Sequence, residues 1–180
     1  AHGVEKNVYT EAKERDIELV DLTCPNVLKI HDVVKDFSNK EYYIFLIGKK
    51  EHPEIIGTYS FAGQNCTIIS NEDEVEIAVK KLEESKLNNL LIISQTTYNL
   101  QVFNEISEKV KEELKNKDIH IEIKNTICYA TELRQKETEK ISKEVEAMII
   151  VGGKNSSNTT KLYDISKKNC QNVIFVQNAE

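Results

Sequence analysis

One unit recurs along this chain and constrains its fold more than any other feature: a short apolar run, a polar loop and then a helical segment. The run 42–47, for example, precedes the polar loop 48–54. After Pro25, the residues Val27, Ile30 and Val34 lie at the spacing of one helix face. Short apolar runs that alternate with helices predict parallel sheets with helices on both faces. We therefore expect an α/β fold of parallel sheets flanked by helices.

The same patterns give the bounds of the expected elements. Strands are predicted at 17–22, 42–47, 67–70, 89–93, 119–123, 147–151 and 172–176. Helices are predicted at 5–15, from Pro25 to about Phe37, just after Glu54, and at 72–84, 99–115, 128–143 and 158–168. Residues 25–124 already suffice for a complete α/β unit, so a domain boundary is expected near Asn125.

Composition excludes several classes of function. The net charge is −6, with both signs interspersed, which argues against nucleic acid as a partner. No apolar run approaches the roughly 20 residues that cross a bilayer, and no signal-peptide pattern is present, so we expect a cytoplasmic protein without membrane contact. The chain begins at Ala1 rather than at Met and stops at Glu180, just after an expected strand. We therefore expect an internal fragment of a longer protein.

Polar and titratable residues follow five of the expected strands. They are Cys24, then His52 and Glu54, then Thr96 and Thr97, then Cys128, and finally Ser156, Ser157 and Asn158. In open α/β sheets ligands bind beyond the carboxyl ends of the strands, so these loops are expected to face one pocket. His52 and Glu54 flank a rigid proline at a strand end, as acid–base chemistry requires.

Each of these loops also has a purely structural interpretation. A cysteine before a helix is often a small buried residue, although a helix N-terminus favours the thiolate. Hydroxyl and amide side chains before a helix are common N-caps, and the same groups can hold a phosphate. Cys66 and Cys170 are interpreted as structural, and His31 and His120 as ordinary helix and strand residues.

Six sequence blocks together resemble the 4-hydroxy-3-methylbut-2-enyl diphosphate reductase family. The blocks are Ala1–Gly3, Asp21–Pro25, Glu51–Thr58, Gln95–Thr97, Ile127–Thr131 and Lys154–Asn158, in the order and with the spacing of the family. The resemblance implies that Cys24 and Cys128 are two of three thiolates that hold a [4Fe-4S] cluster. It implies that Glu54 and Thr96 handle protons at the substrate hydroxyl.

The remaining residues of these blocks are implied to bind substrate. His2, His52, Ser156 and Asn158 match diphosphate-binding residues, and Thr96, Thr97 and Ser157 lie in the same substrate-binding blocks. The third cysteine ligand belongs to a family segment that is missing from this chain. Ferredoxin or flavodoxin is implied as the electron donor.

The resemblance also implies a fold of three α/β lobes in a trefoil. Residues 1–24 would end the first lobe, 25–124 would form the second, and 125–180 would form most of the third. Two rival functions remain open at this point: a metal-free α/β module that binds a phosphorylated metabolite, and a structural or interaction fragment without activity of its own.

Overall fold

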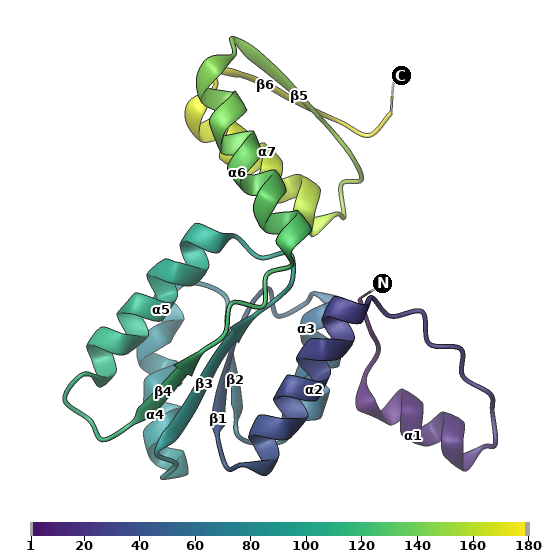
Figure 1. The fold of residues 1–180 in the computed structure, drawn as a ribbon, viewed down its shortest axis with the longest axis vertical. Coiled ribbons are helices and arrows are strands. Elements are labelled where there is room, and N and C mark those ends of the chain that lie inside the picture. The colour runs from purple at the N-terminus through teal and green to yellow at the C-terminus, as the bar shows by residue number, and fades with distance from the viewer. Residues whose placement is uncertain (1, 179–180) are drawn as a thin grey trace. The chain divides into compact units, whose positions relative to one another are not determined.

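The computed structural model describes residues 2–178, in two compact units (Figure 1). The first unit comprises Ala1–Thr96 with Gln101–Thr126, and the second comprises Thr97–Leu100 with Ile127–Glu180. No helix within the described residues is long and apolar enough to cross a membrane. Each unit is a small α/β structure with its own parallel sheet, which confirms the expected fold class.

The first unit contains a four-stranded sheet in the order β2-β1-β3-β4, with every neighbouring pair parallel. The strands are β1 (Tyr43–Ile47), β2 (Cys66–Ile69), β3 (Asn89–Ser94) and β4 (His120–Ile123). The helices are α1 (Lys6–Glu14), α2 (Pro25–Asn39), α3 (Pro53–Ala62), α4 (Val75–Ser85) and α5 (Leu100–Leu114), and a 3₁₀ turn at Glu72–Glu74 precedes α4. Helices α2 and α3 cover one face of the sheet, and α4 and α5 cover the other (Figure 1).

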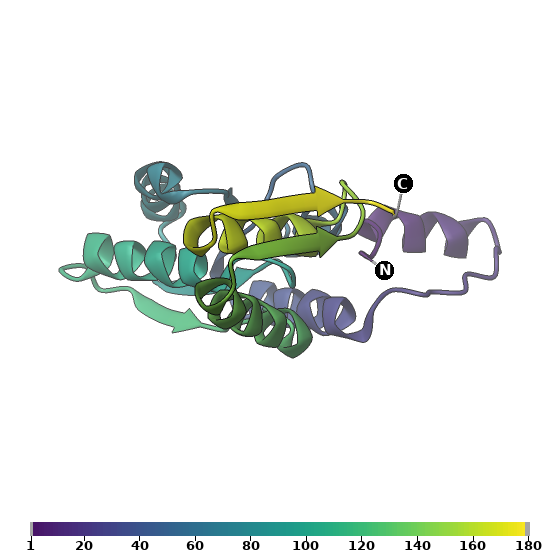
Figure 2. The same ribbon diagram turned by 90° about the horizontal axis from the view of Figure 1, so that it is seen from above.

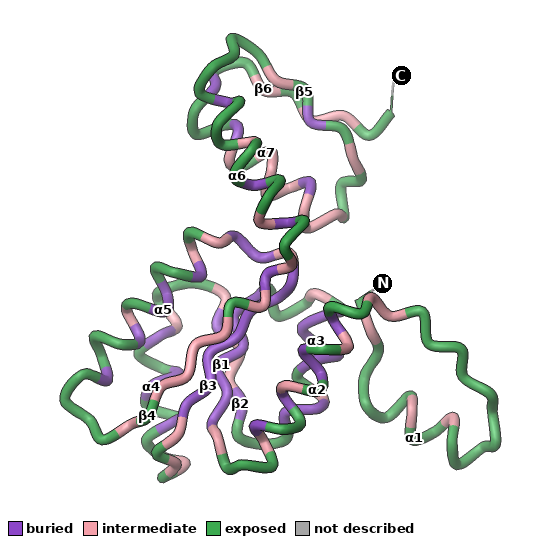
Figure 3. Tube along the Cα trace, in the orientation of Figure 1, coloured by how far each residue is buried: buried purple, intermediate pink, exposed green. Residues whose placement is uncertain are grey.

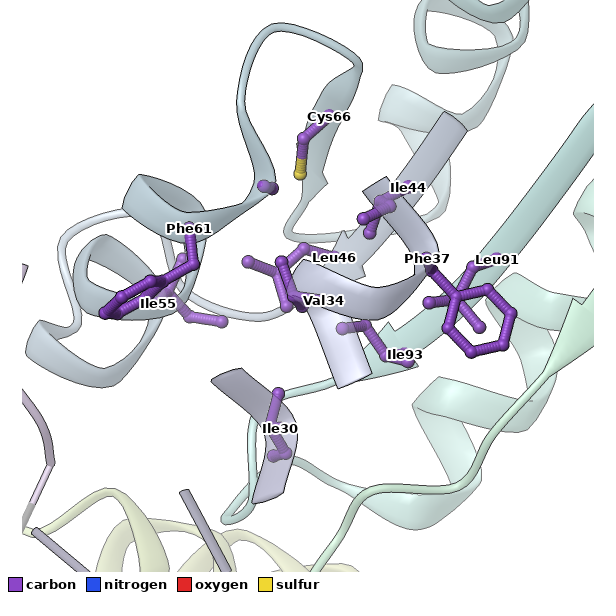
Figure 4. Close-up of a cluster of buried hydrophobic side chains, with 11 residues drawn as sticks. Ile30, Val34, Phe37, Ile44, Leu46, Ile55, Phe61, Cys66, Leu91 and Ile93 are labelled. Atoms are coloured by element: carbon purple, nitrogen blue, oxygen red, sulfur yellow. The ribbon is translucent and has the colours of Figure 1, made fainter. Parts of the chain in front are cut away.

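The core of this unit centres on β1, in which no residue is more than 4% exposed. Side chains that alternate along β1 and β3 meet α2 and α3 on one face of the sheet. This cluster consists of Ile30, Val34, Phe37, Ile44, Leu46, Ile55, Phe61, Ala62, Cys66, Leu91 and Ile93 (Figure 4). Burial of both faces explains why β1 is a continuous apolar run rather than an alternating one.

The second unit pairs β5 (Ala147–Val151) with β6 (Asn172–Val176) in parallel (Figure 2). Its helices are α6 (Tyr129–Glu144) and α7 (Ser157–Asn169). Ile150 is 9% exposed, whereas its neighbour Ile149 is 66% exposed, so alternate residues of β5 face opposite environments. The expectation of helices on both faces is therefore correct for the first sheet and wrong for the second, within the described residues.

The predicted strand at 17–22 is wrong. No strand of the described residues pairs with this segment, and its apolar side chains are exposed, including Val20 and Leu22. Figure 3 shows the stretch that contains α1 and this segment as largely exposed, in contrast to β1 and β3. The sequence pattern reports β propensity, but a strand forms only where a neighbour supplies backbone hydrogen bonds.

The buried core of β3 predicts a large difference between two matched substitutions. Ile93 is fully buried, whereas Ile77 on α4 is 58% exposed. We expect Ile93→Ala to lower the free energy of unfolding by about 2–5 kcal/mol, because it leaves a cavity. Ile77→Ala should change it by less than about 0.5 kcal/mol. Urea denaturation followed by circular dichroism measures both, and equal effects would contradict this account of the core.

Candidate functional site

A buried carboxyl group lies at the end of the first sheet. Glu54 sits in the first turn of α3 and is only 1% exposed. Its Oε1 accepts a hydrogen bond from the backbone N of Thr96 at 2.5 Å, and its Oε2 accepts one from Thr96 Oγ1 at 2.7 Å. Burial raises the pKa of Glu54, and the two bonds from Thr96 only partly oppose this rise. The group is thus held closer to its protonated form than an exposed glutamate.

The register of β1 and β3 brings these two residues together. Ile47 is paired with Ser94, and the Gln95 backbone N donates to Ile47 O at 2.8 Å. The chain leaves β1 through Gly48, where an added Cβ would collide with Ile55 Cδ1. Gln95 Oε1 also accepts from the backbone N of Lys49 at 3.3 Å.

Sequence reasoning gave Gly48 no role and treated Gln95 only as part of the Gln95–Thr97 block, although both residues hold the loop that leads to Glu54. A glycine directly after a buried strand was the available signal, since glycine there often marks a close approach of chain segments. The Gln95–Thr97 block marked Gln95, but no local pattern indicated its hydrogen bond with the Lys49 backbone.

His52 is the N-cap of α3, and its Nδ1 accepts from the backbone N of Glu54 at 3.2 Å. An acceptor Nδ1 places the ring proton on Nε2 in the neutral imidazole. The His2 ring stands edge-on to it, with 5.1 Å between ring centroids. Burial lowers the pKa of His52, and His2 and Lys49 lower it further. His52 therefore offers a neutral N–H donor beside Glu54.

The two candidate metal ligands cap helices in different units. Cys24 is the N-cap of α2, where Pro25 occupies the first turn. Cys128 is the N-cap of α6, and its Sγ accepts from Thr131 N at 3.4 Å and lies 3.0 Å from Thr131 Oγ1. Both thiols are free and half-buried. Thiolates at helix N-termini are suitable iron ligands, so both donors fit an iron–sulfur group.

The other two cysteines have different surroundings. Cys66 is buried in β2, and burial raises its pKa far above the usual range. Cys170 is also buried, with its Sγ 3.6 Å from the backbone O of Val145. Within residues 2–178, no three His, Cys, Asp or Glu side chains are grouped so that they could hold a metal ion.

The polar loop before α7 is built around a cap. Ser156 Oγ accepts from Thr159 N at 3.3 Å and from Thr159 Oγ1 at 3.0 Å, so the capping interpretation holds for this residue. An added Cβ on Gly152 would lie 2.5 Å from Thr159 Oγ1, which accounts for the glycine. Asn158 Oδ1 is buried without a hydrogen-bond partner among the described residues.

The structure thus brings some predicted site residues together. In the first unit, Glu54 bonds to Thr96, and His52 bonds to the Glu54 backbone and contacts His2. In the second unit, Ser156, Ser157 and Asn158 form the start of α7, and Cys128 starts α6. Thr97 lies in a turn assigned to the second unit, although its neighbour Thr96 belongs to the first.

Fold and site define an α/β protein in which titratable and hydroxyl side chains follow the carboxyl ends of parallel strands, where such proteins bind small molecules. The family described as LytB protein matches residues 1–180, and this chain belongs to that family. The resemblance found in the sequence blocks is therefore confirmed.

Curated relatives carry the expected enzyme name. The 4-hydroxy-3-methylbut-2-enyl diphosphate reductase of Alkaliphilus oremlandii is 39% identical over 175 residues, which are 97% of this chain and 59% of the relative. That of Clostridioides difficile is 38% identical over 165 residues, which are 92% of this chain and 56% of the relative. The chain thus spans somewhat more than half the length of these two relatives.

Solved structures agree with this result. The E-1-hydroxy-2-methyl-but-2-enyl-4-diphosphate reductase from Plasmodium falciparum is 33% identical, with a TM-score of 0.83 over 99% of this chain and 54% of that one. A structure described as the terminal enzyme of the non-mevalonate pathway is 32% identical, with a TM-score of 0.65 over 99% of this chain and 61% of that one.

The environment of Glu54 predicts how stability depends on pH. Its pKa is raised above the ordinary 4.5, so ionisation is easier in the unfolded chain and opposes folding as the pH rises through this window. The glutamine side chain in Glu54→Gln cannot ionise, and its amide oxygen can still accept the hydrogen bond from the Thr96 backbone N. We expect this variant to unfold at higher urea than the wild type at pH 8, with a gain that shrinks toward pH 4.

The matched control is Glu76→Gln, at an exposed position of α4. It should show no pH-dependent gain from the loss of a buried carboxylate. If Glu54→Gln is instead less stable than the wild type at pH 8, the ionised Glu54 carboxylate is stabilised in the folded chain, which contradicts the prediction.

Proposed function

We propose that this chain forms part of a 4-hydroxy-3-methylbut-2-enyl diphosphate reductase, an oxidoreductase of the non-mevalonate isoprenoid pathway. The reaction removes the substrate hydroxyl and gives isopentenyl and dimethylallyl diphosphate. The observation that carries the proposal is the buried Glu54–Thr96 pair beside His52, in a chain of the LytB family.

The proposed chemistry needs a proton donor that is shielded from water. The C–O bond to the hydroxyl breaks, two electrons enter, and two protons are consumed, one by the departing hydroxyl as water and one by carbon. Glu54, with its raised pKa, can supply a proton to the hydroxyl. Thr96 Oγ1 is 2.7 Å from Glu54 Oε2, so a proton can pass between them.

We propose that the diphosphate is held by histidine, serine and asparagine side chains and by helix termini, without arginine. His52 offers its Nε2–H, and His2 stands beside it. The start of α7 offers Ser156, Ser157 and Asn158, and Thr97 is assigned to the same substrate. Helix N-termini favour bound anions through their free backbone N–H groups. The buried Oδ1 of Asn158 has no hydrogen-bond partner within residues 2–178, which supports a polar ligand at that loop.

Cys24 and Cys128 are the proposed protein ligands of a [4Fe-4S] cluster, and a third thiolate is expected from outside these 180 residues. When bound, such a cluster supplies electrons and an open iron position for the substrate oxygen. Ferredoxin or flavodoxin is the proposed electron donor, and the cytoplasm the proposed compartment.

The lobes are assigned as proposed from the resemblance: 1–24 to the first, 25–124 to the second and 125–180 to the third. The division of the structure after Thr126 supports the boundary near Asn125. Residues 1–24 are grouped with the first structural unit, so their assignment to a separate lobe rests on the resemblance alone.

The role of Glu54 is tested by Glu54→Gln in the whole protein that contains this chain. Glutamine keeps the shape of the side chain but cannot donate a carboxylic proton. We expect turnover with a reduced chemical donor to fall by about 10²-fold or more, the scale of general acid catalysis, while iron content and substrate binding persist. Near-normal turnover with a full cluster would remove Glu54 from the mechanism. Glu76→Gln serves as the control for an unrelated glutamate.

The cluster assignment predicts the metal content of the 180-residue chain. Its two half-buried thiols are too few to hold a cluster with three protein ligands, and affinity falls steeply when a ligand is lost. After anaerobic reconstitution, iron and acid-labile sulfide should stay well below stoichiometric. Recovery of about four irons per chain, the content of one [4Fe-4S] cluster, would instead make Cys66 or Cys170 a ligand. Diphosphate binding by a metal-free whole protein would favour the alternative of a metal-free binding module.

A further inference from the structure

The segment that carries His2 rests directly on helix α2. Gly3 has a φ of +79°, and an added Cβ there would lie 2.8 Å from His31 Cε1 and 3.3 Å from Val27 Cγ1. A methyl group at this position would therefore collide with the His31 ring. Gly3 therefore lies against the His31 ring, one residue away from His2.

His31 is itself held in place by burial and by a contact with Phe61. The residue is 2% exposed, and its ring lies on the Phe61 ring with 4.5 Å between centroids and an interplanar angle of 31°. Its Nε2 has no hydrogen-bond partner among the described residues. Burial lowers the pKa of His31, and Lys35 lowers it further, so the ring is neutral near pH 7. The contacts of this histidine are thus those of a packed ring.

Helix α3 fixes the same segment from the other direction. An added Cβ on Gly57 would lie 3.2 Å from Val4 O, so the helix and the Val4 backbone approach closely. The backbone N of Lys6 donates to Ser60 Oγ at 2.8 Å, and Ser60 Oγ donates to Gly57 O at 2.6 Å. Residues 3–6 therefore contact both α2 and α3. The next residue toward the N-terminus is His2, whose ring centroid lies 5.1 Å from that of His52.

We propose that His31 is a positioning residue for His2: its ring, packed against Phe61, supports Gly3 and so holds the His2 imidazole beside His52. The support is steric, through ring shape, and requires no proton transfer by His31. The consequence for substrate binding rests on the proposed function, in which His2 and His52 bind the diphosphate. The position of His2 beside His52, which His31 is proposed to hold, does not depend on the proposed function.

The geometric part is tested on the 180-residue chain by NMR. In the wild type, ring protons of His2 and His52 should show a mutual nuclear Overhauser effect. His31→Ala should abolish it, while the amide signals of β1 and β3 stay in place. His31→Phe keeps an aromatic ring against Phe61 and should retain the effect. Persistence of the effect in His31→Ala would overturn the proposal, as would its loss in His31→Phe.

Two glycine substitutions give a matched pair. Gly3 and Gly63 both have positive φ, at +79° and +72°, but nothing lies within 4 Å of an added Cβ on Gly63. Both alanine variants carry the cost of that backbone conformation, and only Gly3→Ala also strikes His31. Gly3→Ala should lose the His2–His52 contact and Gly63→Ala should keep it. Equal behaviour of the two variants would contradict a role for the His31 contact.

The functional part is tested by steady-state kinetics of the whole protein. Loss of a diphosphate donor weakens binding, so His31→Ala should raise KM about tenfold, equivalent to about 1.4 kcal/mol, with kcat nearly unchanged. His31→Phe should restore KM. If the wild type has no reductase activity, the proposed function fails while the NMR result stands. If KM is unchanged in His31→Ala although the His2–His52 contact is lost, the positioning has no role in substrate binding.

Discussion

The parallel pairing of β1 with β3 is the constraint on which the first unit depends. These strands are neighbours in the sheet although β2 lies between them in the chain, and their register sets Ile47 opposite Ser94. Because both strands are buried on both faces, a shift by one residue would turn every side chain to the wrong face. The loops beyond Ile47 and Ser94 therefore leave the sheet at fixed positions. Glu54 and Thr96 can meet only because those two exits are adjacent.

Helix capping and candidate chemistry use the same atoms in this chain. Cys24, His52, Cys128 and Ser156 are all N-caps, and three of them accept a hydrogen bond from their own helix. A cap bond fixes the side chain at the point where free backbone N–H groups and the helix dipole favour negative charge. The structural and functional interpretations of these residues are therefore compatible: capping holds the side chain, and the helix terminus provides the electrostatic setting.

The local pattern of the sequence predicted most elements but little of their long-range contact. Apolar runs and helical spacing located β1, β3 and α2, because these segments are buried as their patterns imply. The apolar run at residues 17–22 gave a wrong prediction, because this segment has no neighbouring strand to pair with among the described residues. Periodicity could not reveal that Thr96 bonds to Glu54, since this depends on strand order. The spacing of His31 matches the apolar face of α2 and predicts an ordinary helix residue, whereas its contact with Gly3 cannot be read from a local window of sequence.

The two-stranded sheet of the second unit has a consequence for local stability. Ile149, Val151 and Ile174 are exposed on it, so each strand gains apolar burial from one face only, and a pair of strands alone is barely stable in water. Such a region opens at lower free energy than a core with both faces covered, and its amide protons exchange sooner. The loop that contains Ser156 and Asn158 thus follows a strand of low local stability. A ligand that binds this loop would also slow the opening of β5 and β6. Part of the free energy of ligand binding would then stabilise the folded second unit.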